Sequence, residues 1–136
     1  MVRQDRWESR FYAVLEDARN KPYVLGEHDC FRLACRVIEA LTGVDRWPEF
    51  AGYTTERQAL RKLAQFGPSF EEAGDWFFGA PRIDLKLARR GDICALVDEA
   101  GQKHLAVLVD DRAACMLPAG LLFIEAKRCH CAWRVG

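Results

Sequence analysis

The 136-residue sequence predicts an α+β domain in which N-terminal helices pack on a small antiparallel β-sheet or barrel. Two observations lead to this prediction. Up to about residue 80, apolar residues recur at the spacing of amphipathic helices. Beyond that point they form short runs separated by polar and glycine-containing turns, which is typical of strands. Helices followed by strands is the order of an α+β fold, and we expect one domain over residues 1–136.

The first two helices are predicted from apolar spacing and from the residues at their ends. The spacing indicates a first helix over about residues 4–19. A second helix begins near Asp29 or Cys30 and ends at Gly43, because glycine favours the backbone conformation that follows a helix end. Between them, residues 20–29 are predicted to form a loop.

Two capping patterns predict further helices. Thr55 with Gln58, and Ser69 with Glu72, have the spacing at which a hydroxyl caps the first turn of a helix. The segment 44–53, between the second helix and the first of these caps, is predicted to be irregular.

The strands are predicted from five short apolar runs after residue 80. Turn-forming sequences separate them, such as DEAGQK and PAG. The runs are ICALV (93–97), HLAVLV (104–109), RAACML (112–117), LLFIEA (121–126) and CAWRV (131–135).

The charge balance excludes some classes of partner. Lys plus Arg and Asp plus Glu both number 20, so the formal charge is zero and no polybasic tract is present. We therefore expect no nucleic-acid partner and no attraction to anionic membranes. The sequence also has no apolar run of membrane-span length and no secretory leader pattern, which predicts synthesis in a cytoplasm and no membrane anchor.

Six cysteines are present, yet no CxxC pair occurs among them. In a reducing compartment most are expected to be small buried apolar residues, Cys35 and Cys94 among them. The only tight cluster is Cys129-His130-Cys131. It lacks the second short-spaced pair that a zinc site normally uses, so we expect no metal or cofactor and keep a zinc-binding module as a minor alternative.

Cys30 is the cysteine whose position suggests chemistry. A thiol at a helix start lies beside the positive end of the helix dipole, which favours the thiolate. A cysteine nucleophile also needs a base, and the sequence offers His28, His104 and His130. His104 opens a predicted strand, His28 is better explained as a loop residue, and a buried structural role for Cys30 is the competing interpretation.

Three segments carry a resemblance to a known family. PYVLGEHDCFRLACRVIEALTG (22–43), RRGDICALV (89–97) and KHLAVLVDD (103–111) resemble the Asp-Cys helix, the Gly-Asp strand start and the histidine strand of the NlpC-type (papain-like) cell-wall cysteine peptidases. The chain most resembles small phage-tail proteins of that fold, through Thr-Gly-Val-Asp at 42–45, Gly52-Tyr53 and the final Trp-Arg-Val at 133–135.

The resemblance implies site residues and a function. Cys30 would be the nucleophile and His104 the base, with Tyr23 on the substrate or oxyanion side and Asp29 shaping the helix start. The activity would be hydrolysis of an amide in the peptidoglycan stem peptide by a phage tail-tip protein during genome delivery. Its partners would be other tail-tip or hub proteins. It would be made in the host cytoplasm and carried in the virion.

The sequence also departs from the family pattern. Phe31 and Arg32 stand where these enzymes usually have Ser-Gly, and the residue that should orient His104 falls near Cys115 or Met116. Neither is suited to orienting an imidazole, which leaves a backbone carbonyl or one of two aspartates, Asp110 and Asp111, as alternatives. These departures support a second hypothesis, a catalytically inactive structural or adaptor subunit of the tail tip. The aromatic residues between 47 and 78 would then form either a core cover or an interface.

Overall fold

The computed structural model describes residues 2–136, and its elements confirm the predicted order of helices before strands. Two short 3-10 helices, at Leu85–Leu87 and Ala126–Arg128, lie among the later elements. The helices are α1 (Trp7–Arg19), α2 (Cys30–Thr42), α3 (Trp47–Phe50), α4 (Glu56–Phe66) and α5 (Phe70–Phe78). The strands are β1 (Ile93–Val97), β2 (Lys103–Leu108), β3 (Arg112–Leu117), β4 (Gly120–Glu125) and β5 (Cys129–Trp133).

The five strands form one open antiparallel sheet in the order β4-β3-β2-β1-β5. Of the two predicted forms, sheet and barrel, the sheet is therefore the one observed, with β4 and β5 at its edges. The register of β1 against β2 pairs Ile93 with Val107 and Leu96 with His104. β2 and β3 pair through only two residues, Val107 and Leu108, so these strands separate toward the start of β2.

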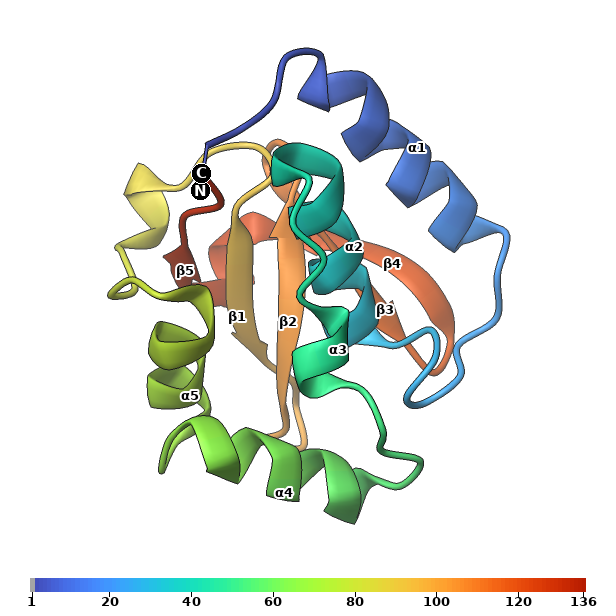
Figure 1. The fold of residues 1–136 in the computed structure, drawn as a ribbon, viewed down its shortest axis with the longest axis vertical. Coiled ribbons are helices and arrows are strands. Elements are labelled where there is room, and N and C mark those ends of the chain that lie inside the picture. The colour runs from blue at the N-terminus through green and yellow to red at the C-terminus, as the bar shows by residue number, and fades with distance from the viewer. Residues whose placement is uncertain (1) are drawn as a thin grey trace.

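Helices cover one side of the sheet, with α2 lying across its centre (Figure 1). In the same view α4 lies beyond the hairpin end of β1 and β2, and α5 lies beside β5. The strongly amphipathic α2 buries Leu33, Val37, Ile38 and Leu41 against β2 and β3. This packing brings the start of α2 to the start of β2, and that junction positions the site.

The helix starts agree with the capping patterns in the sequence. The Asp29 carboxylate accepts a hydrogen bond from the Arg32 amide at 2.9 Å, so α2 begins at Cys30 as predicted. Thr55 and Ser69 cap α4 and α5 through amides three residues further on. The predicted first helix is three residues too long, since α1 begins at Trp7.

One helix was not predicted. The short α3 falls in the segment expected to be irregular, where Pro48 lies in its first turn and the Asp45 carboxylate accepts a hydrogen bond from the Trp47 amide at 3.0 Å. Four residues give no usable periodicity, whereas the Asp45 bond to the Trp47 amide and the proline in the first turn favour a helical turn at this position. Among residues 2–136, none of the helices combines the length and apolarity of a membrane span.

Candidate active site

A cleft of about 450 Å³ lies between the start of α2, the length of α4 and the hairpin that joins β1 to β2. All four residues implied by the family resemblance line it: Cys30, His104, Tyr23 and Asp29. They come from the loop before α2, from the first turn of α2 and from β2. The fold therefore brings together residues that are more than 70 positions apart in the sequence.

Asp29 shapes the helix start through both of its carboxylate oxygens. Oδ1 accepts the Arg32 amide, and Oδ2 accepts the Gly26 amide at 2.8 Å together with the hydroxyl of Tyr53. The residue is only 2 % exposed, and these donors satisfy a carboxylate that would otherwise be costly to bury. Asp29 therefore fixes the first turn of α2, and with it the position of Cys30.

Gly26 is required by the close approach of this loop to residue 53. Its φ is +83°, and a Cβ atom built on it would lie 2.1 Å from the carbonyl oxygen of Tyr53. A side chain here would push the loop away from Tyr53 and loosen the bonds that Asp29 makes.

Cys30 lines the cleft, and the residue as a whole is 7 % exposed. Burial raises its pKa to about 12, although hydrogen bonds from the backbone amides of Leu105, Cys30 and Phe31 act in the opposite direction. The helix start therefore favours the thiolate as expected, but burial outweighs it. At neutral pH the resting group is a thiol, so it needs a base to act as a nucleophile.

His104 also lines the cleft, and it is held there by a residue that the sequence did not indicate. Its Nε2 lies 2.8 Å from Oδ2 of Asp98, the residue that follows β1. The residues that the sequence suggested for orienting His104 are used elsewhere. Asp110 accepts a hydrogen bond from the Arg112 amide in the next hairpin, and the Cys115 thiol donates to the Leu105 carbonyl. The bond to Asp98 leaves Nδ1 of His104 for another partner.

Tyr23 contributes a phenol to the wall of the cleft. Burial, followed by the nearby charge of Asp29, raises its pKa to about 12. The hydroxyl is therefore protonated at neutral pH and can donate a hydrogen bond to a bound group.

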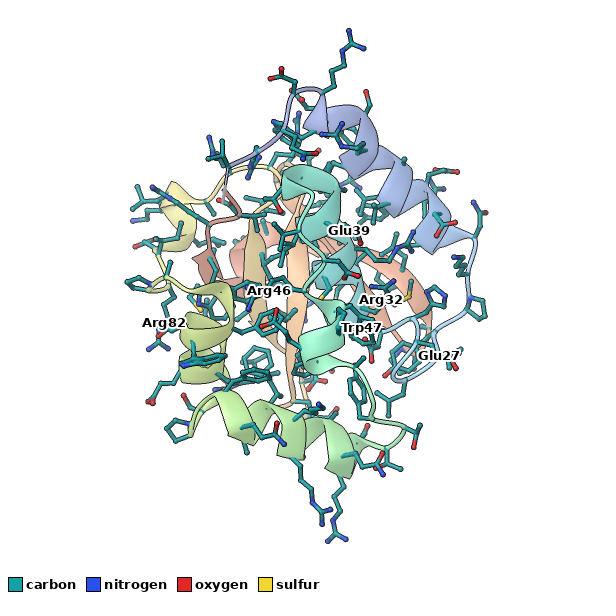
Figure 2. All side chains as sticks on the ribbon, in the orientation of Figure 1. Glu27, Arg32, Glu39, Arg46, Trp47 and Arg82 are labelled. Carbon is teal, nitrogen blue, oxygen red and sulfur yellow. The ribbon has the colours of Figure 1, made fainter. Side chains whose placement is uncertain are left out.

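The side chains of the bulky pair after Cys30 go to different places: Phe31 to the cleft and Arg32 to the Trp47 ring. Phe31 lines the cleft and packs on Phe50 with ring centroids 4.6 Å apart. Arg32 points elsewhere: its guanidinium lies 5.2 Å from the centre of the Trp47 ring, and Figure 2 shows the two side chains together in front of the sheet. Phe31 therefore narrows the cleft, whereas Arg32 leaves it open.

The other cysteines and histidines do not join this site. Cys35 and Cys94 are buried in the core, as expected. His130 bonds Glu71 at 3.0 Å, outside the cleft. His28 is held in the loop by backbone pairing with Val24. Within residues 2–136, no three side chains of the types that bind metals gather at one place.

Two contributors escaped the sequence analysis. Tyr53 is 24 residues from Asp29, and no local pattern links them. Asp98, in contrast, begins the polar turn before His104, and in a hairpin the residues on either side of a short turn lie close together. A search for carboxylates in the turn preceding His104 would have found it.

A comparison with protein families assigns the chain to one of them. The model of a family described as "Domain of unknown function (DUF6950)" matches residues 2–135, nearly the whole chain. The chain therefore belongs to the DUF6950 family. No curated protein matches it.

Proposed function

We propose that this member of the DUF6950 family is a thiol-dependent amide hydrolase, with Cys30 as the nucleophile and His104 as the base. The observation that carries the proposal is that both side chains, from distant parts of the chain, line one cleft. A thiol at a helix start and a carboxylate-bound histidine on a facing strand are the parts that nucleophilic catalysis by cysteine requires.

The reaction follows from the protonation states. The Cys30 sulfur attacks the carbonyl carbon of the amide while its proton passes to Nδ1 of His104. The C–N bond then breaks, the imidazolium returns that proton to the leaving amine, and a thioester remains on Cys30. Water then attacks the thioester while His104 takes one of its protons. The C–S bond breaks to release the acid, and the imidazolium returns its proton to the Cys30 sulfur.

Two donors in the cleft are suited to the charge that develops on the carbonyl oxygen. The Cys30 backbone amide is at the positive end of α2, and the Tyr23 phenol is protonated at neutral pH. Fixed donors at such an oxyanion lower the barrier most in a site with little water.

The substrate class rests on the family resemblance. We propose an amide of the peptidoglycan stem peptide, cleaved by a phage or phage-like tail-tip protein during genome delivery. The volume of the cleft is within the range of about 300–1,000 Å³ usual for small ligands, enough for a few residues of a stem peptide. Its partners would be other tail-tip or hub proteins, and the chemistry uses no metal or cofactor.

One observation favours the second candidate, a structural or adaptor subunit of the tail tip without turnover. The Cys30 thiol is deeply buried, and its pKa of about 12 is that of an unreactive thiol. The two candidates differ in whether removing the sulfur changes anything besides packing.

The test is incubation of the purified protein with purified peptidoglycan. The release of new amino groups is followed, and mass spectrometry identifies the fragments. We expect cleavage by the wild type and none by Cys30→Ala. The matched control is Cys35→Ala, which removes a buried thiol five residues further along the same helix and should retain cleavage. Equal cleavage by Cys30→Ala would overturn the enzyme proposal, and a wild type that releases nothing would favour the adaptor.

A further inference from the structure

Asp98 uses its two carboxylate oxygens for two different purposes. Oδ1 accepts the backbone amides of Ala100 and Gln102, both at 2.9 Å, and so closes the turn between β1 and β2. Oδ2 meets Nε2 of His104 at 2.8 Å. The histidine ring is thereby tied to the turn that builds one wall of the cleft.

The protonation of this pair follows from its chemistry. The hydrogen bond from His104, followed by that from the Gln102 amide, lowers the pKa of Asp98, so the group is ionised at neutral pH. An ionised carboxylate can only accept hydrogen bonds. Nε2 of His104 must therefore carry a hydrogen, and in the neutral ring the lone pair is on Nδ1.

We propose that Asp98 is the positioning residue of the His104 base: it selects the tautomer whose Nδ1 can take a proton and holds the ring at the cleft. This inference rests on the proposed function. It places the orienting carboxylate on the turn before the histidine strand rather than on the strand after it. The Cys115 thiol on that later strand is bonded to the Leu105 carbonyl at 3.3 Å instead.

The variant that tests the role is Asp98→Asn. Asparagine suits the same turn, because its carbonyl oxygen can still accept the turn amides. Its amide group would then face the histidine ring as a donor, which favours a lone pair on Nε2 and a hydrogen on Nδ1. We expect the ¹⁵N signals of the His104 ring to change from the Nε2–H to the Nδ1–H tautomer.

The same variant has a chemical readout. Alkylation of Cys30 by iodoacetamide at neutral pH should slow, and amide cleavage should fall by about 10⁴-fold, the loss typical when a histidine base is held in the wrong tautomer. The matched control is Asp110→Asn, since Asp110 also accepts a turn amide, that of Arg112 at 2.9 Å, but in the hairpin without a histidine. It should change neither the ring signals nor the rates.

The outcomes separate this inference from the proposed function. An unchanged His104 tautomer in Asp98→Asn overturns the positioning role even if the wild type cleaves peptidoglycan. A tautomer change in Asp98→Asn but not in Asp110→Asn supports the positioning role. It does so even if the wild type cleaves no peptidoglycan, because that result counts against the hydrolase and not against the pairing of Asp98 with His104. A tautomer change in both variants overturns the inference, because the ring would then respond to turn chemistry in general.

Discussion

The two ends of β1 carry aspartates with opposite uses. Asp92, just before the strand, is fully buried and accepts the guanidinium of Arg3 at 2.9 Å, the amide of Val135 at 3.0 Å and the amide of Arg89 at 2.9 Å. Asp98, just after the strand, accepts turn amides and the ring of His104 at the cleft. Both carboxylates accept several hydrogen bonds, but only Asp98 is bonded to a group that can also take up a proton.

The difference lies in what the partners do next. Arg3 also donates to the carbonyls of Val135 and Arg90, both at 2.7 Å, so the Asp92 network is closed on itself and ties the two ends of the described chain together, where Figure 1 shows them side by side. His104 lines the cleft, and its second ring nitrogen is not used by the bond to Asp98. A buried network whose donors and acceptors are all paired with one another stabilises a fold. A network that includes an unpaired ring nitrogen can also transfer a proton.

The largest loss of stability is expected when the Asp92 network is broken. Asp92→Ala leaves Arg3 without its counter-charge and the amides of Val135 and Arg89 without an acceptor. Loss of one partner of a buried ion pair costs about 3–5 kcal/mol. Urea unfolding measures the change in free energy. Asp84→Ala, which removes an exposed cap on Lys86, is the control and should cost about 1 kcal/mol or less. Equal losses in the two variants would show that the Asp92 network contributes no more than a surface cap.

The second largest effect is expected at the start of α2, where Asp29 holds the wall of the cleft. Tyr53→Phe removes the hydroxyl that bonds Asp29 and leaves a buried oxygen short of a donor, which costs about 1–3 kcal/mol. The loosened helix start should also make Cys30 easier to alkylate. Thermal unfolding and peptide mapping of labelled Cys30 measure the two changes. An unchanged melting temperature would mean that the Asp29 network does not need this donor.

A smaller effect is expected beside the cleft, where Glu71 bonds Lys103 at 2.6 Å and His130 at 3.0 Å. Burial alone would raise the pKa of Glu71, but hydrogen bonds from Lys103, its own amide and His130 lower it to about 2. A depressed carboxyl pKa stabilises the fold above the ordinary value of 4.5, and this contribution is lost as the pH falls toward 2.

We expect Glu71→Gln to cost about 1 kcal/mol at pH 7, the size of a partly exposed ion pair, and the cost to shrink steadily below pH 4.5. Denaturant unfolding of wild type and variant across pH 3–7 gives the difference. A loss of stability that does not vary with pH would mean that the negative charge of Glu71 does not contribute to its interaction with Lys103 and His130.

The smallest effect on stability sharpens the comparison. Asp98→Asn should leave the melting temperature close to that of the wild type, because asparagine can keep the turn bonds at this half-buried position. The same variant is expected to have a large effect on the chemistry of His104. A loss of stability as large as that of Asp92→Ala would mean that both ends of β1 are structural.

Sequence reasoning succeeded where the signals are local. The start of α2 follows from Asp29 three residues before Arg32, and the strands follow from apolar runs bounded by turns. The open edges of the sheet were not predictable, because whether β4 meets β5 is a matter of curvature along the whole sheet. In the site, Cys30 and His104 followed from the resemblance, but the Tyr53 donor depends on a contact between distant segments.

The central claim is that His104 is the base for the Cys30 thiol. Alkylation with iodoacetamide at several pH values tests it most directly. Wild type and His104→Ala are compared, and peptide mapping gives the rate for each cysteine. The account predicts that Cys30 reacts faster than Cys35, which is also buried but lies outside the cleft, and that this advantage disappears in His104→Ala. If Cys30 reacts no faster than Cys35, or at the same rate with and without His104, the cleft holds an inert thiol and the claim is contradicted.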